Sequence, residues 1–149
     1  MAEPVGIASG VLAFAAAAFQ ASIALCNTIK SFQHHNTRVR DLTNEVEALS
    51  AVLGALNETL RSTVDLDLSS LDIPLERCSH ACKEFQEEIL KCSSRSSESR
   101  ASFRDWAKLR YMGDDIDGFR RLLVGYKLTI NVALTDATLE NFPGRKFTQ

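Results

Sequence analysis

The sequence lacks a large excess of charge of either sign, a glycine-rich phosphate loop and any evident internal repeat. Its 149 residues include 17 lysines and arginines against 19 aspartates and glutamates, for a formal net charge of -2. This balance gives no support for a nucleic-acid partner, which usually meets a basic surface. Without a phosphate-binding loop, these residues do not support nucleotide binding either. We therefore expect no nucleic-acid partner, no small-molecule substrate and no cofactor.

The sequence also lacks the cysteine pattern of a disulfide framework, in which bridges staple the loops of a small domain. Its four cysteines lie within apolar-periodic segments: Cys26, Cys78, Cys82 and Cys92. We interpret them as reduced core residues of a cytoplasmic protein. A cleaved signal peptide is the alternative, but residues 1–3 supply no lysine or arginine and the uncharged run is longer than the apolar h-region of a typical signal peptide.

Charge is missing altogether from residues 4–29, a run of 26 residues. About 20 apolar residues can span a bilayer. This run nevertheless contains polar residues that a transmembrane helix would rarely need: Ser9, Gln20, Ser22, Asn27 and Thr28. We expect a helix over 4–32 that is largely buried in a bundle, with one narrow face of small or polar residues formed by Ser9, Ala13, Ala16, Gln20, Ala24, Asn27 and Ser31.

Three more long helices follow from apolar residues spaced alternately three and four apart. The second, after a cap at Asn36 or Thr37, carries Val39, Leu42, Val46, Leu49, Leu53, Leu56 and Leu60. The third begins near Pro74 and carries Leu75, Cys78, Cys82, Phe85, Ile89 and Cys92. The last runs from Asp114 to about Asn141 with Ile116, Phe119, Leu123, Tyr126, Ile130, Ala133 and Ala137.

The segments between these helices are polar. Residues 62–72 predict a loop that lies on the bundle, and 93–102 form a serine-rich loop. A short helix containing Trp106 follows, with Ser102 as its cap. The sequence therefore predicts one all-α domain over 1–149, an antiparallel bundle of four long helices and one short helix.

Candidate sites for chemistry are weak. Cys78, His80 and Cys82 suggest zinc, but a helix turns His80 away from the cysteines and no fourth ligand is evident. The aspartates of 113–118 lack the spacing of a calcium loop and are better explained as a capped helix start. His34 and His35 lie in a turn, apart from the core cysteines. We expect no metal site and no enzymatic activity.

A basic stripe offers a candidate membrane contact. Arg100, Arg104 and Lys108 recur every four residues, with Trp106 and Tyr111 nearby. Basic residues beside aromatic ones suit anionic lipid headgroups. The alternative is an ordinary solvated helix face.

Three sequence blocks carry a family resemblance. They are MAEPVGIASG at 1–10, RVRDL at 38–42 followed by EALSAVL at 47–53, and IDGFRRLL at 116–123 followed by GYK at 125–127. Together they resemble the HeLo-like N-terminal domain of fungal STAND proteins, the NOD-like receptors, across nearly the whole chain. The resemblance implies a cytosolic bundle that heads a receptor-like protein and serves in programmed cell death or heterokaryon incompatibility. Related domains also occur in proteins encoded beside fungal pigment-biosynthesis genes.

By the same resemblance, and by analogy with the killer bundle of the necroptosis pseudokinase, oligomerisation would release the first helix towards the plasma membrane. The residues that would enter the bilayer are Val5, Ile7, Val11, Leu12, Phe14, Phe19, Ile23, Leu25 and Ile29. The alternative is a non-lytic adaptor whose first helix never leaves the core. The 149 residues contain no nucleotide-binding module, so we expect an excised domain or a stand-alone relative.

Overall fold

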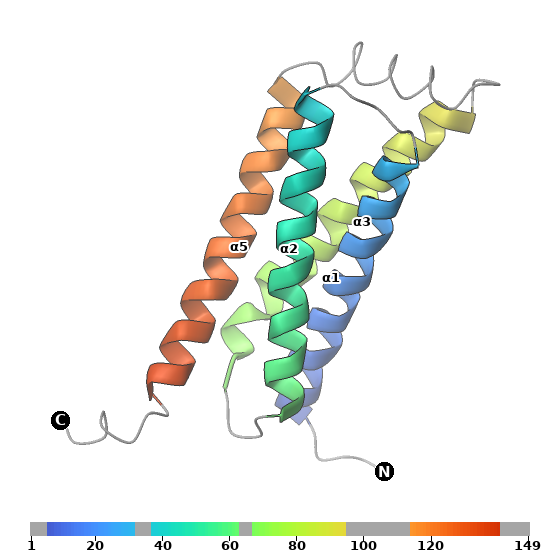
Figure 1. The fold of residues 1–149 in the computed structure, drawn as a ribbon. Helices are drawn as coiled ribbons and strands as arrows, with labels where there is room; N and C mark the ends of the chain where they lie inside the picture. Colours follow the sequence, from blue (N-terminus) through green and yellow to red (C-terminus); the bar gives the residue numbers. More distant parts are fainter. Residues whose placement is uncertain (1–5, 32–36, 63–66, 95–113, 141–149) are drawn as a thin grey trace.

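The computed structural model describes residues 6–31, 37–62, 67–94 and 114–140, and these ranges form a bundle of long helices (Figure 1). The helices are α1 (Gly6–Lys30), α2 (Thr37–Ser62), α3 (Asp72–Ser94) and α5 (Asp114–Glu140), with a short 3-10 turn, η1 (Ser69–Leu71). The described ranges contain no strand, and the prediction of an all-α bundle is confirmed. The predicted short helix around Trp106 lies outside them.

The four helices alternate in direction along the bundle (Figure 1). α1 packs along both α2 and α3, whereas α5 packs mainly on α2 and touches α3 less. The start of α1 and the end of α5 therefore lie at the same end of the molecule (Figure 1). In this arrangement α1 has two helical neighbours along its length, and α5 has chiefly one.

The core consists of the predicted apolar stripes. On α2 the stripe is buried from Val39 to Leu56, with Leu60 partly buried, and on α3 it is buried from Leu75 to Ile89. The predicted loop over 62–72 contains the turn η1, whose flanking Leu68 and Leu71 are both buried. The prediction that this segment lies on the bundle is therefore confirmed for its described part, and two leucines hold it there.

Two side-chain contacts attach α5 to its neighbours. Lys127 Nζ lies 3.2 Å from Glu45 Oε1 on α2, and both side chains are mostly buried. The rings of Phe85 on α3 and Phe119 on α5 stack with centroids 4.1 Å apart. Stacked aromatic pairs add modestly to apolar burial, so this pair holds α5 where its contact with α3 is otherwise small.

Candidate functional site: the apolar first helix and its polar contacts

The apolar helix α1 is the strongest functional feature of the molecule. Within it, Gly10–Lys30 is long and apolar enough to cross a membrane by length and composition. The same test is passed by a core helix of a soluble protein, and one face of α1 serves that role here. Its buried side consists of Val11, Ala15, Ala18, Ala21, Ser22, Leu25, Cys26 and Ile29.

The opposite side of α1 faces solvent and is almost free of large apolar groups. Ala13, Gln20, Asn27 and Ser31 are exposed, and Ala16 and Ala24 are partly exposed. These residues belong to the narrow face of small and polar residues predicted from the sequence. The exposed positions described on α1 therefore carry alanine, polar groups or Lys30 and no large apolar side chain.

The predicted membrane-entering residues occupy two environments. Val11, Leu25 and Ile29 are fully buried, whereas Leu12, Phe14, Phe19 and Ile23 are partly buried on the flanks. Val5 and the side chain of Ile7 lie outside the described residues. A membrane could therefore meet the flanking side chains first, and the buried three only if α1 moved away from α2 and α3.

A buried pair of hydroxyls joins the middle of α1 to α2. Ser50 Oγ donates a hydrogen bond to Ser22 Oγ at 2.8 Å, and Ser22 Oγ donates to the Phe19 carbonyl of its own helix at 2.8 Å. Ser22 is fully buried. Because this hydrogen bond is short and buried, it fixes the register of α1 against α2 at this level.

One helical turn along α2, Gly54 lies against the ring of Phe19. A Cβ added at Gly54 would lie 3.4 Å from Cε1 of Phe19, which is ordinary van der Waals contact, so alanine would also fit at this position. Next to it, Asn57 Nδ2 donates to the Ala15 carbonyl of α1 at 3.1 Å and to Leu53 at 2.8 Å. Asn57 Oδ1 is buried and has no hydrogen-bond partner, which reduces the net stability of this contact.

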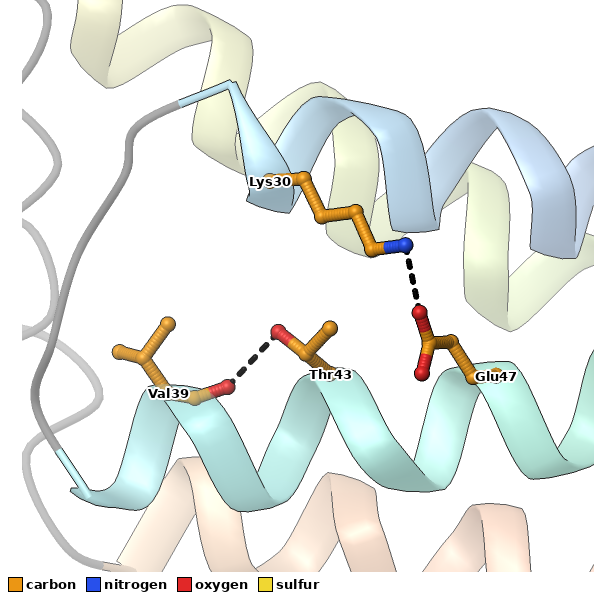
Figure 2. Close-up of polar contacts among 4 residues, drawn as sticks. All are labelled: Lys30, Val39, Thr43 and Glu47. Carbon is orange, nitrogen blue, oxygen red and sulfur yellow. Dashed lines mark hydrogen bonds and ion pairs between the residues drawn. The ribbon is translucent and has the colours of Figure 1, made fainter.

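The C-terminal end of α1 is held from both sides. Gln86 Nε2 on α3 donates to Thr28 Oγ1 at 2.9 Å. Lys30 forms an ion pair with Glu47 on the neighbouring helix α2 (Figure 2). In the same view, the Thr43 hydroxyl donates a hydrogen bond to the Val39 carbonyl of its own helix. Hydrogen bonding to Glu47 raises the pKa of Lys30. We call these four links, made by Ser50, Asn57, Gln86 and Glu47, the α1 contacts.

The described cysteines are structural. Cys26, Cys78 and Cys82 are buried free thiols, as the sequence predicted, and the side chain of Cys92 lies outside the described residues. A hydrogen bond with Cys82, together with burial, raises the pKa of the Cys78 thiol, and burial raises the pKa of Cys26. Thiols that stay protonated are poor nucleophiles and poor metal ligands.

Other sequence candidates do not gather into a site. His80 is exposed beside Glu84, while Cys78 and Cys82 face the core, so this trio does not converge. The described residues contain no group of three or more potential metal ligands. Asp114 begins α5, in agreement with the capped-helix interpretation of 113–118. His34, His35 and the basic stripe of Arg100, Arg104, Trp106 and Lys108 lie outside the described residues.

Sequence reasoning missed the partners that hold α1. It noted Ser22 and Thr28 as polar interruptions, but it did not pair them with Ser50 and Gln86. A signal was present, because Ser50 and Asn57 stand seven residues apart beside the leucine stripe of α2. Polar residues in heptad register next to an apolar seam are candidates for contacts between helices.

Comparison with known proteins identifies a family. No curated protein and no solved structure matches the chain. The profile of the family described as "Pigment biosynthesis cluster protein PigL N-terminal" matches residues 2–146, which include every described helix. The chain therefore belongs to the PigL N-terminal family, a HeLo-like family of helical domains.

Proposed function

We propose that this domain is the membrane-targeting effector of a fungal immune or incompatibility receptor, and that oligomerisation releases α1 into the plasma membrane to cause cell death. One observation carries the proposal: an uncharged helix long enough to cross a bilayer is held in the bundle by a small set of polar contacts. In this proposal the resting protein is cytoplasmic, and the described bundle is its inactive state.

The free energy gained by burying the apolar side chains of α1 does not by itself keep the helix in the bundle when a bilayer is near. Burying a leucine or isoleucine such as Leu25 or Ile29 is worth roughly 1.5–3 kcal/mol relative to water. Lipid tails are about as apolar as a leucine side chain, so this energy is largely recovered in a membrane. In water, by contrast, release would forfeit all of it, which favours retention until a membrane is reached.

The α1 contacts then oppose the transfer of α1 from the bundle to the bilayer. A net hydrogen bond is worth about 0.5–1.5 kcal/mol and an exposed ion pair less than about 1 kcal/mol. Lys30 stands at the end of the apolar span, where its ammonium group could stay at headgroup level after insertion. Anionic headgroups are therefore the proposed lipid partner, with the basic stripe at 100–108 as a second predicted contact.

Release also leaves a gap in the remaining bundle. The faces of α2 and α3 that pack on α1 belong to the buried core and would meet water. Exposure of that much apolar surface is unfavourable unless something replaces α1. Self-association of several copies would cover those faces, and for this reason the proposal couples release to oligomerisation.

The hydroxyl pair allows a direct test. Because Ser22 Oγ and Ser50 Oγ lie 2.8 Å apart, a double variant, Ser22→Cys with Ser50→Cys, should form a disulfide that ties α1 to α2. The chain, fused at its C-terminus to a trimerising coiled coil, is added to vesicles of phosphatidylcholine and phosphatidylserine loaded with dye. We expect leakage from the reduced double variant and none from the oxidised one.

Each Ser→Cys single variant under oxidant is the control, because it carries the same chemistry without the bridge. Phe14→Glu is a second variant, since its partly buried position tolerates change better than Leu25 does. It should fold and should fail to permeabilise. Equal leakage from the oxidised and reduced double variant, or a trimeric wild type that releases no dye, would remove the basis of the proposal.

The competing function is a non-lytic adaptor in which the bundle docks other proteins. The observation that favours it is the complete burial of Leu25 and Ile29 between two helices, because a helix packed on both sides is costly to remove. The same disulfide separates the two functions. An adaptor should bind its partners and signal equally well with α1 tied to α2.

A further inference from the structure

The outer face of α5 is apolar although no described element covers it. Leu128 is 59% exposed, Val132 is 65% exposed and Leu139 is 43% exposed. Together with Gly118, Gly125 and Thr135, these three residues follow heptad spacing. One row consists of residues 118, 125, 132 and 139, and a second row consists of residues 128 and 135. Such spacing makes a straight stripe on the side of α5 opposite its buried residues Phe119, Leu123 and Ile130.

The described residues offer no reason for the glycines of this stripe. A Cβ added at Gly118 or at Gly125 would meet no atom of the described residues within 4 Å. Glycine weakens a helix interior relative to alanine, and here alanine would fit. A glycine on an exposed helix face has a physical purpose when another backbone or side chain must approach closely.

In one register of two antiparallel α5 helices, the glycines of the stripe and a neighbouring pair of charged residues face complementary residues of the second copy. If residue 125 of one copy faces 132 of the other, the same two-fold axis places 118 opposite 139 and 121 opposite 136. Each glycine then receives an exposed aliphatic side chain, Val132 or Leu139, from the second copy. Arg121 faces Asp136, and two-fold symmetry makes that ion pair twice. Arg121 and Asp136 are both exposed.

We propose that two copies of this chain associate through the outer face of α5, antiparallel and in this register. The occupant is a second copy because the face is complementary to itself in shape and in charge. Neither Arg121 nor Asp136 forms an ion pair with another described residue, so both are available to the second copy. None of the α1 contacts lies on this face, so the dimer is independent of the release of α1.

The interface is one helix face about 32 Å long, from residue 118 to 139, at 1.5 Å per residue. An interface of this size belongs to the small, reversible class. Sedimentation equilibrium of the wild-type chain, without lipid, at concentrations up to on the order of 500 μM should show a monomer–dimer equilibrium. Val132→Lys places an ammonium group opposite Gly125 on each side of the two-fold axis and should weaken dimerisation at least about 100-fold.

Leu90→Lys is the matched control, because Leu90 is 47% exposed on α3 and the change is the same. It should dimerise as the wild type does. Arg121→Asp alone should weaken the dimer about tenfold, and the double variant Arg121→Asp with Asp136→Arg should restore it to within about threefold, because the pair is reversed and kept. Circular dichroism verifies that each variant is folded.

A wild type that stays monomeric over this range overturns the proposal, as does a Val132→Lys variant that dimerises normally. A double charge reversal that fails to rescue Arg121→Asp overturns the register. If the monomeric wild type binds vesicles and Val132→Lys abolishes that binding, the face belongs to a membrane and not to a second copy. None of these outcomes depends on dye leakage, so they leave the test of the proposed function unchanged.

Discussion

The helices α1 and α5 differ in a way that composition does not predict. α1 is the more apolar helix, yet every exposed position described on it carries alanine, a polar group or Lys30. α5 includes four aspartates, two arginines and a lysine over its length, yet it exposes Leu122, Leu128, Val132 and Leu139. Apolar content therefore does not indicate which helix shows an apolar surface to a partner.

The difference arises from the number of neighbours. α1 lies against α2 and α3, and two packed sides are enough to hide its large side chains. α5 lies mainly against α2, so its outer half remains available even though its inner half is buried. Two kinds of interaction follow from one fold: a concealed apolar helix that needs a trigger, and an exposed apolar stripe that needs only a partner.

The largest expected contrast compares a leucine from each helix. Leu25→Ala in α1 should lower the free energy of unfolding by about 3 kcal/mol, because a fully buried leucine leaves a cavity. Leu128→Ala in α5 should lower it by less than about 0.5 kcal/mol, since Leu128 is 59% exposed. Urea denaturation at low micromolar protein measures both. Equal losses would mean that α1 is no better packed than the outer face of α5.

Alkaline pH should destabilise the bundle through its buried thiols. Hydrogen bonding with Cys82 and burial raise the pKa of Cys78, and burial raises that of Cys26, above the 9.0 of an ordinary thiol. Stability is therefore complete below pH 9 and falls above it, because the unfolded chain releases protons that the folded chain retains. By pH 10 the Cys78 thiol should cost about 1.4 kcal/mol relative to neutral pH, and Cys26 should add to the decline in the same direction.

A control isolates the thiol in this experiment. Cys78→Ala should flatten the decline between pH 9 and 10 by about 1 kcal/mol, whatever its effect on stability at pH 7. The Lys30 ion pair does not contribute to the decline in stability between pH 9 and 10, since the pKa of Lys30 is raised above 10.5 and the ammonium group stays charged in this range. An unchanged decline in the variant would show that Cys78 is not the titrating group.

The fold could be predicted almost completely from residue spacing. The alternation of three and four from Val39 to Leu56, and from Leu75 to Ile89, specifies which side of α2 and α3 is buried. The narrow alanine and polar face of α1 was equally visible, because Ala13, Gln20 and Asn27 share one side of a helix. Periodicity identifies a buried face wherever large apolar and small polar residues separate cleanly.

The contacts of the site could not be predicted in the same way. Periodicity assigns Ser50 and Asn57 to positions beside the α2 seam, but it does not say which helix they meet. The exposed stripe of α5 was missed for a related reason. Leu128 and Val132 lie outside the predicted core stripe of α5, but spacing alone does not say whether another helix covers that side, and α5 has α2 as its main neighbour. Both failures concern the arrangement of helices, which spacing alone does not contain.

A smaller effect is expected from the buried hydroxyl pair. Ser50→Ala should reduce stability by about 1 kcal/mol, because Ser22 then loses its partner on α2 and retains only its bond to Phe19. Ser62→Ala is the control: its hydroxyl is exposed and bonds only within α2, so the change should cost less than about 0.5 kcal/mol. Thermal unfolding followed by circular dichroism compares them. A loss no larger than that of the control would mean that α1 is held by apolar packing alone.

The smallest effects compare the ion pairs that link each of the two helices to α2. Lys30 and Glu47 are about half exposed, with side-chain accessibilities of 54% and 47%, whereas Lys127 and Glu45 are each 22% exposed. Lys30→Met should therefore have the smallest effect on stability and should have no effect in 1 M salt, where exposed charges are screened. Lys127→Met should cost about 1 kcal/mol and keep most of that loss in salt, because Glu45 is left half-buried without its partner.

Urea denaturation at 0.05 M and 1 M sodium chloride measures both variants. Lys30→Glu, next to Glu47, serves as a repulsive control, and its effect should exceed that of Lys30→Met only at low salt. If Lys30→Met proves as costly as Lys127→Met at high salt, the end of α1 is held far more tightly than its exposure implies, and release of that helix would have to begin from its other end.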